Sequence, residues 1–299
     1  MSTILLTGVN GQLGWELQRA LAPLGNVVAL TRADLDLSQP DAIRQVVHEH
    51  RPAIILNPAA YTAVDKAEAE PELALAINGT APGVLAEEAR QIGALLVHYS
   101  TDYVFDGSQN APYTEEDVPN PQSIYGKTKL AGESAIRAIG GNHLILRTSW
   151  VYGVHGGNFV KTVLRLAKER DELRIVADQF GAPTWARLLA DSTARMIQGW
   201  QNREFGEDQL GLYHLTAAGR TSWHHYAEEI VRLARQYDPV LRDKALTIHG
   251  IPTSGYPLPA PRPANSVLAT NKIRRTFGLN LPAWQDNLAN CIKEIYGNL

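Results

Sequence analysis

The stretch TILLTGVNGQLGWELQRALAPLG (residues 3–25) decides the fold. A short apolar run is followed at once by a glycine-rich turn and then by apolar residues at helical spacing, with Gly25 as a stop signal. Gly8, Gly11 and Gly14 form the pattern G-x-x-G-x-x-G between the predicted strand and helix. In this position the first glycine permits a tight turn, the second lets a pyrophosphate approach the backbone, and the third lets the helix pack close to the sheet.

The start of this helix is a candidate phosphate site. The free N–H groups near Gln12 and Leu13 would face the phosphates of a bound dinucleotide. No Gly-Lys-Ser/Thr follows the turn, which excludes a nucleoside-triphosphate loop. A plain strand-to-helix turn is the alternative, but the position and spacing of the glycines favour a dinucleotide site.

Four further strands are predicted in the first half of the chain. Continuous apolar runs occupy residues 26–30, 53–57, 94–100 and 143–149, and helical patterns at 39–50 and 71–93 lie among them. Continuous rather than alternating apolar runs are typical of a parallel sheet buried on both faces. The order of strands and helices therefore predicts an α/β fold with a Rossmann-like, doubly wound parallel sheet.

The pattern loosens after residue 150. Helices are predicted at 160–170 and 186–200, a late strand at 211–216, and an ordered loop over a site in the proline-rich stretch 251–266. We expect a dinucleotide-binding domain and a smaller, interleaved C-terminal substrate domain. The first would comprise residues 1–148 plus roughly 176–218, and the second residues 149–175 and 219–299.

Bulk properties exclude several classes of protein. The chain has 299 residues and a formal charge of -3, whereas proteins that follow nucleic-acid backbones are usually basic. Cys291 is the only cysteine, which excludes an internal disulfide and a cysteine-rich metal site. No signal peptide and no apolar stretch of roughly 20 residues are found. We expect a cytoplasmic protein with no nucleic-acid or membrane partner.

The end of the second strand bears on the choice between NAD and NADP. An acidic residue there would bind a ribose 2′-OH, whereas an arginine would suit a 2′-phosphate. The chain has Arg32 at that place, with acids only at Asp34 and Asp36. Arg32 favours NADPH, but an arginine that points to water would leave NADH open. Asp36 and Leu37 are candidates to flank the adenine.

The stretch SIYGKTKLAGE (residues 123–133) suggests acid catalysis. Tyr125 and Lys129 share one face if this stretch is helical. We expect the ammonium to lower the pKa of the tyrosine, which could then give a proton to a carbonyl oxygen as hydride arrives. Ser100 and Thr101 end the fourth strand and could bind the same oxygen. Spacing alone is weak evidence, but the pair follows a nucleotide turn and lies one helix beyond this strand.

The motifs together resemble a known family. GQLGWELQRAL, AAYTAVDKAE, HYSTDYVFDG, YGKTKLAGE, LRTSWVYG, DQFGAPT, LYHL and RPANS are similar to the dTDP-4-dehydrorhamnose reductases of the extended short-chain dehydrogenase/reductase superfamily. The resemblance runs over nearly the whole chain. It implies reduction of the C4 ketone of dTDP-4-dehydro-L-rhamnose by a reduced nicotinamide, the last step of dTDP-rhamnose biosynthesis.

The resemblance also implies residue roles. Tyr125 would be the proton donor and Lys129 its partner, with Thr101 as the third catalytic residue. The remaining implied contacts are Ala59, Ala60 and Tyr61 along the cofactor, Thr101, Asp102 and Trp150 on the sugar, and Arg262 and Asn265 on the diphosphate.

One departure from the family concerns a metal. Bacterial relatives can bind Mg²⁺ through glutamates at a subunit interface, and Glu16 and Glu294 match two of these. Arg187 stands where the third would be, and its charge should repel a divalent ion. We therefore predict no metal site, and an ion pair from Arg187 to an acid in any homodimer. The alternative for both glutamates is a solvated position on a helix.

Two other functions stay open at this point. An epimerase or dehydratase of the superfamily would use the same Tyr/Lys pair but retain tightly bound NAD. A non-catalytic dinucleotide-binding subunit, such as the regulatory subunit of methionine adenosyltransferase, also resembles this family. His98, in a predicted buried strand, is expected to pack there rather than to catalyse.

Overall fold

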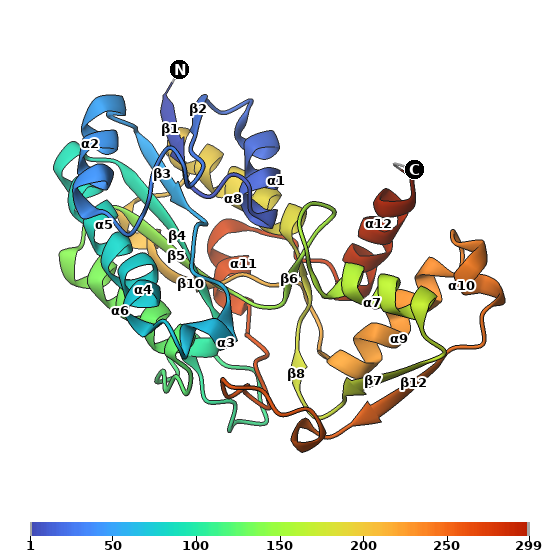
Figure 1. Ribbon diagram of the computed structural model, residues 1–299. Helices are drawn as coiled ribbons and strands as arrows, with labels where there is room; N and C mark the ends of the chain where they lie inside the picture. The colour runs from blue at the N-terminus through green and yellow to red at the C-terminus, as the bar shows by residue number, and fades with distance from the viewer. Residues whose placement is uncertain (1, 298–299) are drawn as a thin grey trace.

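A six-stranded parallel sheet forms the centre of the larger lobe in the computed structural model, which describes residues 2–297 (Figure 1). The strand order is β10-β5-β4-β3-β1-β2, as expected for a Rossmann-like sheet. The strands span β1 Thr3–Leu6, β2 Asn26–Ala29, β3 Ile54–Asn57, β4 Leu95–Thr101, β5 His143–Thr148 and β10 Gly211–His214. Every strand predicted for this sheet is present, with bounds shifted by at most two residues.

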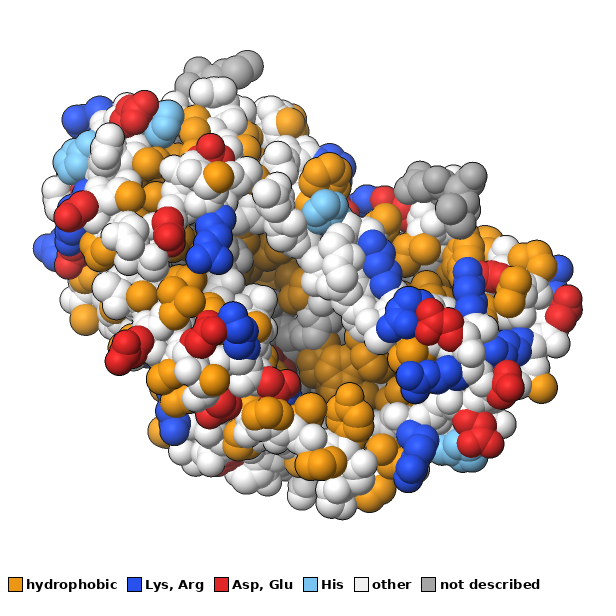
Figure 2. Space-filling view, in the orientation of Figure 1, with side chains coloured by type: hydrophobic (Ala, Val, Ile, Leu, Met, Phe, Trp, Pro, Cys, Tyr) orange, Lys and Arg blue, Asp and Glu red, His pale blue; other side chains and the backbone are white. Residues whose placement is uncertain are grey.

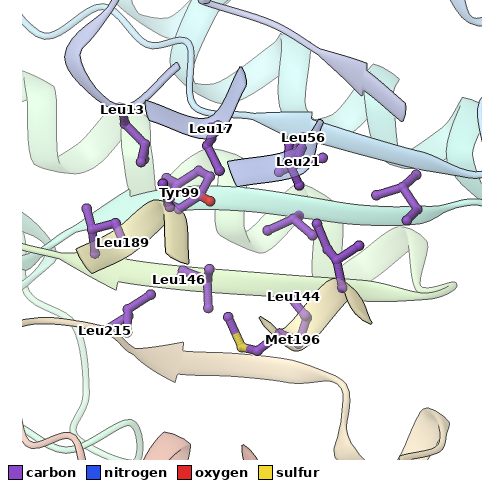
Figure 3. Close-up of a cluster of buried hydrophobic side chains, with 14 of the residues drawn as sticks. Leu13, Leu17, Leu21, Leu56, Tyr99, Leu144, Leu146, Leu189, Met196 and Leu215 are labelled. Atoms are coloured by element: carbon purple, nitrogen blue, oxygen red, sulfur yellow. The ribbon is translucent and has the colours of Figure 1, made fainter. Parts of the chain in front are cut away.

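Helices cover both faces of this sheet. On one face α1 (Gln12–Leu21) and α8 (Ala186–Gln201) pack against alternate strand residues such as Leu144 and Leu146 (Figure 3). On the other face α2 (Pro40–His50), α5 (Ala81–Ile92) and α6 (Ile124–Ile139) pack against the intervening residues, such as Ile145. All seven residues of β4 are buried, which explains its nearly continuous apolar sequence.

The predicted helix at 71–93 is interrupted. It consists of α4 (Pro71–Leu75), a π-helical turn η1 (Ala76–Thr80) and α5. In the turn, the Asn78 side chain accepts a hydrogen bond from the Tyr61 N–H and donates to the Tyr61 carbonyl and to Thr128. A π turn with such contacts often lies at a functional site.

The smaller lobe has its own core. It contains α7 (Phe159–Glu169), α9 (Trp223–Ala234), α10 (Pro239–Asp243) and α12 (Trp284–Gly297), and the parallel pair β7 (Glu172–Val176) and β12 (Thr247–Ile251). Tyr152, Tyr226 and Trp284 are the largest fully buried members of its apolar cluster. Ile273 of α11 (Asn271–Phe277) packs instead with the sheet cluster, although 219–299 was assigned to the substrate domain. The predicted division of the chain stays a prediction.

Short elements complete the chain. They are α3 (Val64–Ala67), η2 (Asp102–Val104), β6 (Val151–Tyr152), β8 (Phe180–Gly181), β9 (Thr184–Trp185), η3 (Glu207–Gln209), β11 (Thr221–Ser222) and η4 (Thr253–Gly255). The proline-rich stretch is held by a β-bridge between Phe180 and Asn265 and by hydrogen bonds from Ala260 and Arg262 to Asp65. None of the helices in the described part of the chain has the length and apolar character needed to cross a membrane.

Candidate active site

A cavity of about 570 Å³ lies where the strands of the sheet end. The space-filling view shows a hollow between the two lobes, with hydrophobic side chains in its interior (Figure 2). The cavity is lined by the glycine turn, the ends of β2, β3 and β4, the start of α6, and Val151, Gly156 and Gly157 from the chain after β5. The carboxyl ends of parallel strands are where such sheets bind ligands.

The glycine turn has the geometry that a dinucleotide requires. Gly8 has a φ of 61°, and a Cβ on Gly14 would lie 2.2 Å from the Gly8 carbonyl oxygen. The helix α1 begins after Gly11 with no side-chain cap among the described residues, so N–H groups of its first turn, from Gln12 and Leu13, are available to an anion. The residues present therefore fit a pyrophosphate.

The rim after β2 favours a 2′-phosphate. Asp34 accepts hydrogen bonds from the backbone N–H and the hydroxyl of Thr31, and Asp36 accepts two from Ser38. These bonds lower the pKa of both carboxyls and commit them to local turns. Arg32 is exposed and lines the cavity beside Asp36. Leu37, also predicted to lie near the adenine, is part of the same rim.

The opposite wall is formed by the residues after β3. Ala59, Ala60 and Tyr61 all line the cavity, and their contact with a cofactor stays a prediction. The Tyr61 backbone is fixed by Asn78, and its hydroxyl donates to Glu70 Oε2 at 2.6 Å. Small side chains at 59 and 60 leave room for a flat ring system.

The proposed proton donor and its partner lie together in this cavity. The helix α6 begins at Ile124 because the Ser123 hydroxyl caps it by accepting from the Gly126 N–H. Tyr125 and Lys129 are one turn apart on this helix, and both line the cavity. A Cβ on Gly126 would lie 2.2 Å from the Tyr103 carbonyl oxygen, so the glycine lets this helix approach the chain after β4.

The expected effect on the Tyr125 pKa is wrong for this structure. Burial raises the pKa of Tyr125 to about 12, and a hydrogen bond with Thr101 offsets only part of this rise. Burial also lowers the pKa of Lys129 to about 8, against an opposing effect of Glu133. The Lys129 ammonium donates to the Tyr99 carbonyl oxygen at 2.6 Å. Desolvation is the largest cause of both shifts, and neither group is among the causes of the other's shift.

Thr101 and Asp102 are buried next to this pair. The Thr101 hydroxyl donates to Asp102 Oδ1 at 3.0 Å and accepts from the Tyr103 N–H. Ser100, not Thr101, lines the cavity directly. Burial raises the pKa of Asp102 to about 6, against opposing side-chain hydrogen bonds with Ser266 and Thr101.

Trp150 is held in a strained conformation. Its φ is 48°, which is uncommon for a large residue, and its ring stacks on Trp223 with centroids 3.5 Å apart. A Cβ on Gly181 would lie 2.4 Å from the Trp150 ring, so the glycine makes room for the indole. The structure therefore fixes an aromatic surface directly before Val151 of the cavity wall.

The two predicted diphosphate contacts have different surroundings. Arg262 forms a two-point ion pair with Asp65, with both N–O distances 2.7 Å, which ties the proline-rich loop to α3. Asn265 is buried, and its amide nitrogen donates to the carbonyls of Gln109 and Ala111. Loop carbonyls use both of these donors here, and a direct contact of Asn265 with the diphosphate stays a prediction. Sequence could not reveal these long-range partners.

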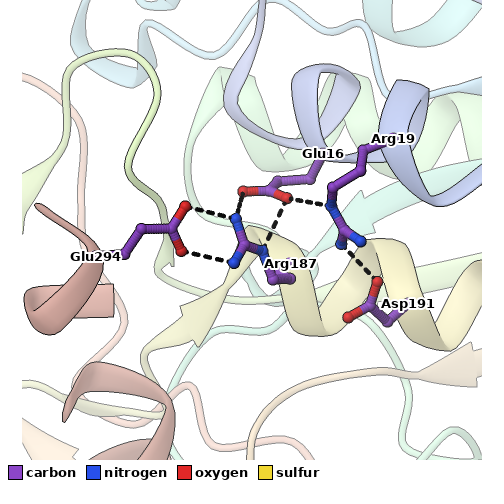
Figure 4. Close-up of polar contacts among 5 residues, drawn as sticks. All are labelled: Glu16, Arg19, Arg187, Asp191 and Glu294. Carbon is purple, nitrogen blue, oxygen red and sulfur yellow. Dashed lines mark hydrogen bonds and ion pairs between the residues drawn. The ribbon is translucent and has the colours of Figure 1, made fainter. Parts of the chain in front are cut away.

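Arg187 pairs with both glutamates of the family metal site (Figure 4). Its Nε lies 3.1 Å from Glu16 Oε2, and its Nη1 lies 2.6 Å from Glu294 Oε2. The interpretation of Glu16 as a solvated residue is wrong, because it is 3% exposed and also contacts Arg19. Residues 2–297 contain no cluster of three metal-binding side chains. A guanidinium joins the two carboxylates within one chain.

A short segment over the glycine turn was missed by the sequence analysis. Asn158 donates to Gln12 Oε1 at 2.9 Å, and the His155 ring stacks on Trp15. Gly156 and Gly157 line the cavity from this segment. The glycine pair in GVHGGN was the available signal, but its partner across the cavity becomes visible only in the fold.

Comparison with known proteins agrees with this geometry. The family model described as the RmlD substrate binding domain matches residues 1–296. A dTDP-4-dehydrorhamnose reductase of Burkholderia thailandensis is 48% identical, and one of Escherichia coli strain K12 is 49% identical, each with 98% of both chains covered. The crystal structure of dTDP-4-dehydrorhamnose reductase from Bacillus anthracis in complex with NADP is 36% identical with a TM-score of 0.89, covering 98% of this chain and 99% of that one. The chain belongs to the dTDP-4-dehydrorhamnose reductase family.

Proposed function

We propose that this protein reduces the C4 ketone of dTDP-4-dehydro-L-rhamnose to give dTDP-L-rhamnose, with NADPH as the reductant. The names of relatives that match nearly the whole chain support the substrate. The observation that carries the proposal is one cavity lined by the glycine turn, Tyr125 and Lys129. A reductase needs a dinucleotide site and an acid at the same place.

The cofactor would be held by groups already described. The first turn of α1 would bind the pyrophosphate, Arg32 the 2′-phosphate, and Ala59, Ala60 and Tyr61 the wall beside the rings. NADPH, when bound, supplies the hydride.

Tyr125 supplies the proton. Its raised pKa keeps the phenol protonated at neutral pH, so that it can donate to the ketone oxygen as negative charge develops there. The tyrosinate left behind would be stabilised by the Lys129 ammonium, which later allows a proton from solvent to restore the phenol. Thr101 would hydrogen-bond the same oxygen and orient the phenol. The balance is one hydride and one proton added to the carbonyl.

Substrate binding would use the second lobe. Trp150 would offer its ring to the sugar, and the Asp102 carboxylate would accept from a sugar hydroxyl. Arg262 is a diphosphate contact if the anion competes with Asp65 for the guanidinium. Asn265 shapes the loop, and its direct contact with the diphosphate stays a prediction. The predicted cytoplasmic location stays a prediction.

The test is an absorbance assay of reduced nicotinamide with the keto-sugar nucleotide. We expect stoichiometric oxidation of NADPH by the wild type. Tyr125→Phe should lose roughly two to four powers of ten in turnover without a change in cofactor affinity. Lys127→Ala, an exposed change on the same helix, is the matched control. Full turnover by Tyr125→Phe would contradict the assignment, and purification with tightly bound NAD would favour an epimerase.

A further inference from the structure

Three polar side chains form a row across the buried sheet beside Lys129. Asn57 of β3 pairs with His98 of β4. Leu6 of β1 pairs with Leu56 of β3, so the next residue, Thr7, lies beside Asn57. Asn57 and His98 have no exposed surface, and Thr7 is 2% exposed. Buried polar groups are costly unless they are hydrogen-bonded, so this row requires an explanation.

The row is one continuous chain of contacts. The Thr7 hydroxyl lies 2.7 Å from Asn57 Oδ1, and Asn57 Nδ2 lies 3.2 Å from His98 Nδ1. His98 Nε2 lies 3.2 Å from the Lys129 Nζ. The row thus runs from the residue before Gly8 of the glycine turn to the amine of the proposed catalytic pair.

The chemistry of the row ties its hydrogen bonds to the charge of Lys129. An ammonium can only donate, so His98 Nε2 must accept and the ring proton must be on Nδ1. In the structure Asn57 directs Nδ2 to His98 Nδ1 and accepts from Thr7 through Oδ1. The ammonium form requires a half-turn of this amide, after which the Asn57 carbonyl oxygen accepts from Nδ1 and the NH₂ donates to Thr7. With the opposite amide orientation the proton is on Nε2, which suits only a neutral amine. Each arrangement of the row therefore matches one charge state.

We propose that His98 is a positioning residue for Lys129. Through Nε2, His98 holds the Lys129 ammonium beside Tyr125, and Asn57 and Thr7 hold His98 in turn. The inference rests on the proposed function, because Lys129 assists Tyr125 there. The Tyr99 carbonyl is the second acceptor of the ammonium. Together the two contacts fix an otherwise flexible side chain in one direction.

The surroundings of the ammonium support this role. Glu133 acts on it from α6 and His98 contacts it from β4, while Arg147 of β5 donates to Glu133 at 2.6 Å. Tyr125 lines the same cavity as Lys129. Burial, and then the charge on Lys129, hold the pKa of His98 well below its usual value. The ring is therefore neutral at neutral pH, and one of its nitrogens is free to accept.

Two substitutions separate the two nitrogens of the ring. In His98→Gln the amide reaches the Nε2 position and keeps an acceptor for Lys129. In His98→Asn it reaches only the Nδ1 position and leaves the ammonium without this contact. We expect His98→Asn to move the alkaline limb of kcat/KM about one pH unit lower, since a hydrogen bond to a charged group shifts a pKa by roughly that amount or more. His98→Gln should largely restore the limb.

Direct titration of Lys129 keeps the test independent of turnover. The ¹³Cε resonance, assigned with Lys129→Met, should titrate about one pH unit lower in His98→Asn than in the wild type. An unshifted titration would overturn the inference, whatever the turnover. A shifted titration in a protein that does not reduce the keto-sugar would support the positioning role and reject the proposed function.

A second pair of variants excludes a general structural effect. Thr193→Val removes the buried hydrogen bond to the Tyr99 hydroxyl, on the face of β4 opposite His98. It should lower stability and leave the titration unchanged, and a shift equal to that of His98→Asn would overturn the inference. If His98→Asn does not fold, Thr7→Val takes its place: a smaller shift in the same direction supports the row, and no shift refutes it.

Discussion

Replacing Arg187 with methionine should destabilise the protein measurably. The guanidinium contacts Glu16 at 3.1 and 3.3 Å and Glu294 at 2.6 and 2.7 Å (Figure 4). The side chain of Glu16 is only 4% exposed, whereas those of Arg187 and Glu294 are 29% and 27% exposed. Methionine keeps the length of the side chain and removes its charge, so the change reports on the ion pairs.

The expected magnitude follows from the burial of each partner. Breaking a buried pair by removing one member costs about 3–5 kcal/mol. In the variant Arg19 still lies 3.3 Å from Glu16 and keeps one cation beside the buried carboxylate. We therefore expect the loss of unfolding free energy to lie at the lower end of this range or below it. Glu294 can turn to water and contributes at most about 1 kcal/mol. We expect Arg187→Met to lower the free energy of unfolding by about 2–3 kcal/mol.

Urea denaturation with two comparison variants tests this reasoning. Arg165→Met removes an exposed pair with Glu169, also with a short 2.7 Å contact, and should change stability by less than about 0.5 kcal/mol. The double variant Glu16→Gln/Arg187→Met should recover part of the lost unfolding free energy. In this variant residue 16 is a neutral amide, so it no longer needs a cation beside it. If Arg187→Met is as stable as the wild type, Glu16 is not held by Arg187 and the argument fails.

Three further predictions concern the cavity. Gly14→Ala places a Cβ against the Gly8 carbonyl and should weaken NADPH binding at least tenfold by calorimetry. Gly255→Ala, which lies outside the cavity lining and has only ordinary contacts around its Cβ, should not. Arg32→Ala should raise the KM for NADPH about tenfold and leave that for NADH unchanged. Because the folded protein lowers the pKa of Lys129 from 10.5 to about 8, the unfolded chain binds more protons between these values. Turnover should therefore fall above about pH 8, while the Lys129 contribution to unfolding free energy rises from pH 8 to 10.5.

The parts of the fold that sequence predicted are those set by local chemistry. The apolar strands, the glycine turn and the Tyr125–Lys129 spacing each lie within a short segment, and each is found where it was expected. The direction of the Tyr125 pKa shift was not predictable in this way, because it depends on burial by the surrounding chain. The strained φ of Trp150 likewise depends on Gly181 and Trp223, which are distant in the sequence.

The burial of acidic residues was also not predictable from local sequence. On α1, Glu16 occupies a position that a sequence pattern reads as solvent-exposed, because carboxylates are rarely buried unless paired. Its partner Arg187 is 171 positions away on α8, so no local rule could have matched them. The hydrogen-bond partners of Asn265 were equally unpredictable, because the carbonyls that accept from it belong to a loop more than 150 residues earlier.

The row of Thr7, Asn57 and His98 shows why strand register carries functional information. Each residue by itself reads as a polar exception in an apolar strand, and such residues are usually satisfied by local contacts. Only the register of three parallel strands places them side by side, with Lys129 at the end. An apolar residue at any of the three positions would spare the sheet a buried polar group. All three residues are nevertheless polar, and their hydrogen bonds are consistent with only two arrangements. A need to control the charge at Lys129 explains this best.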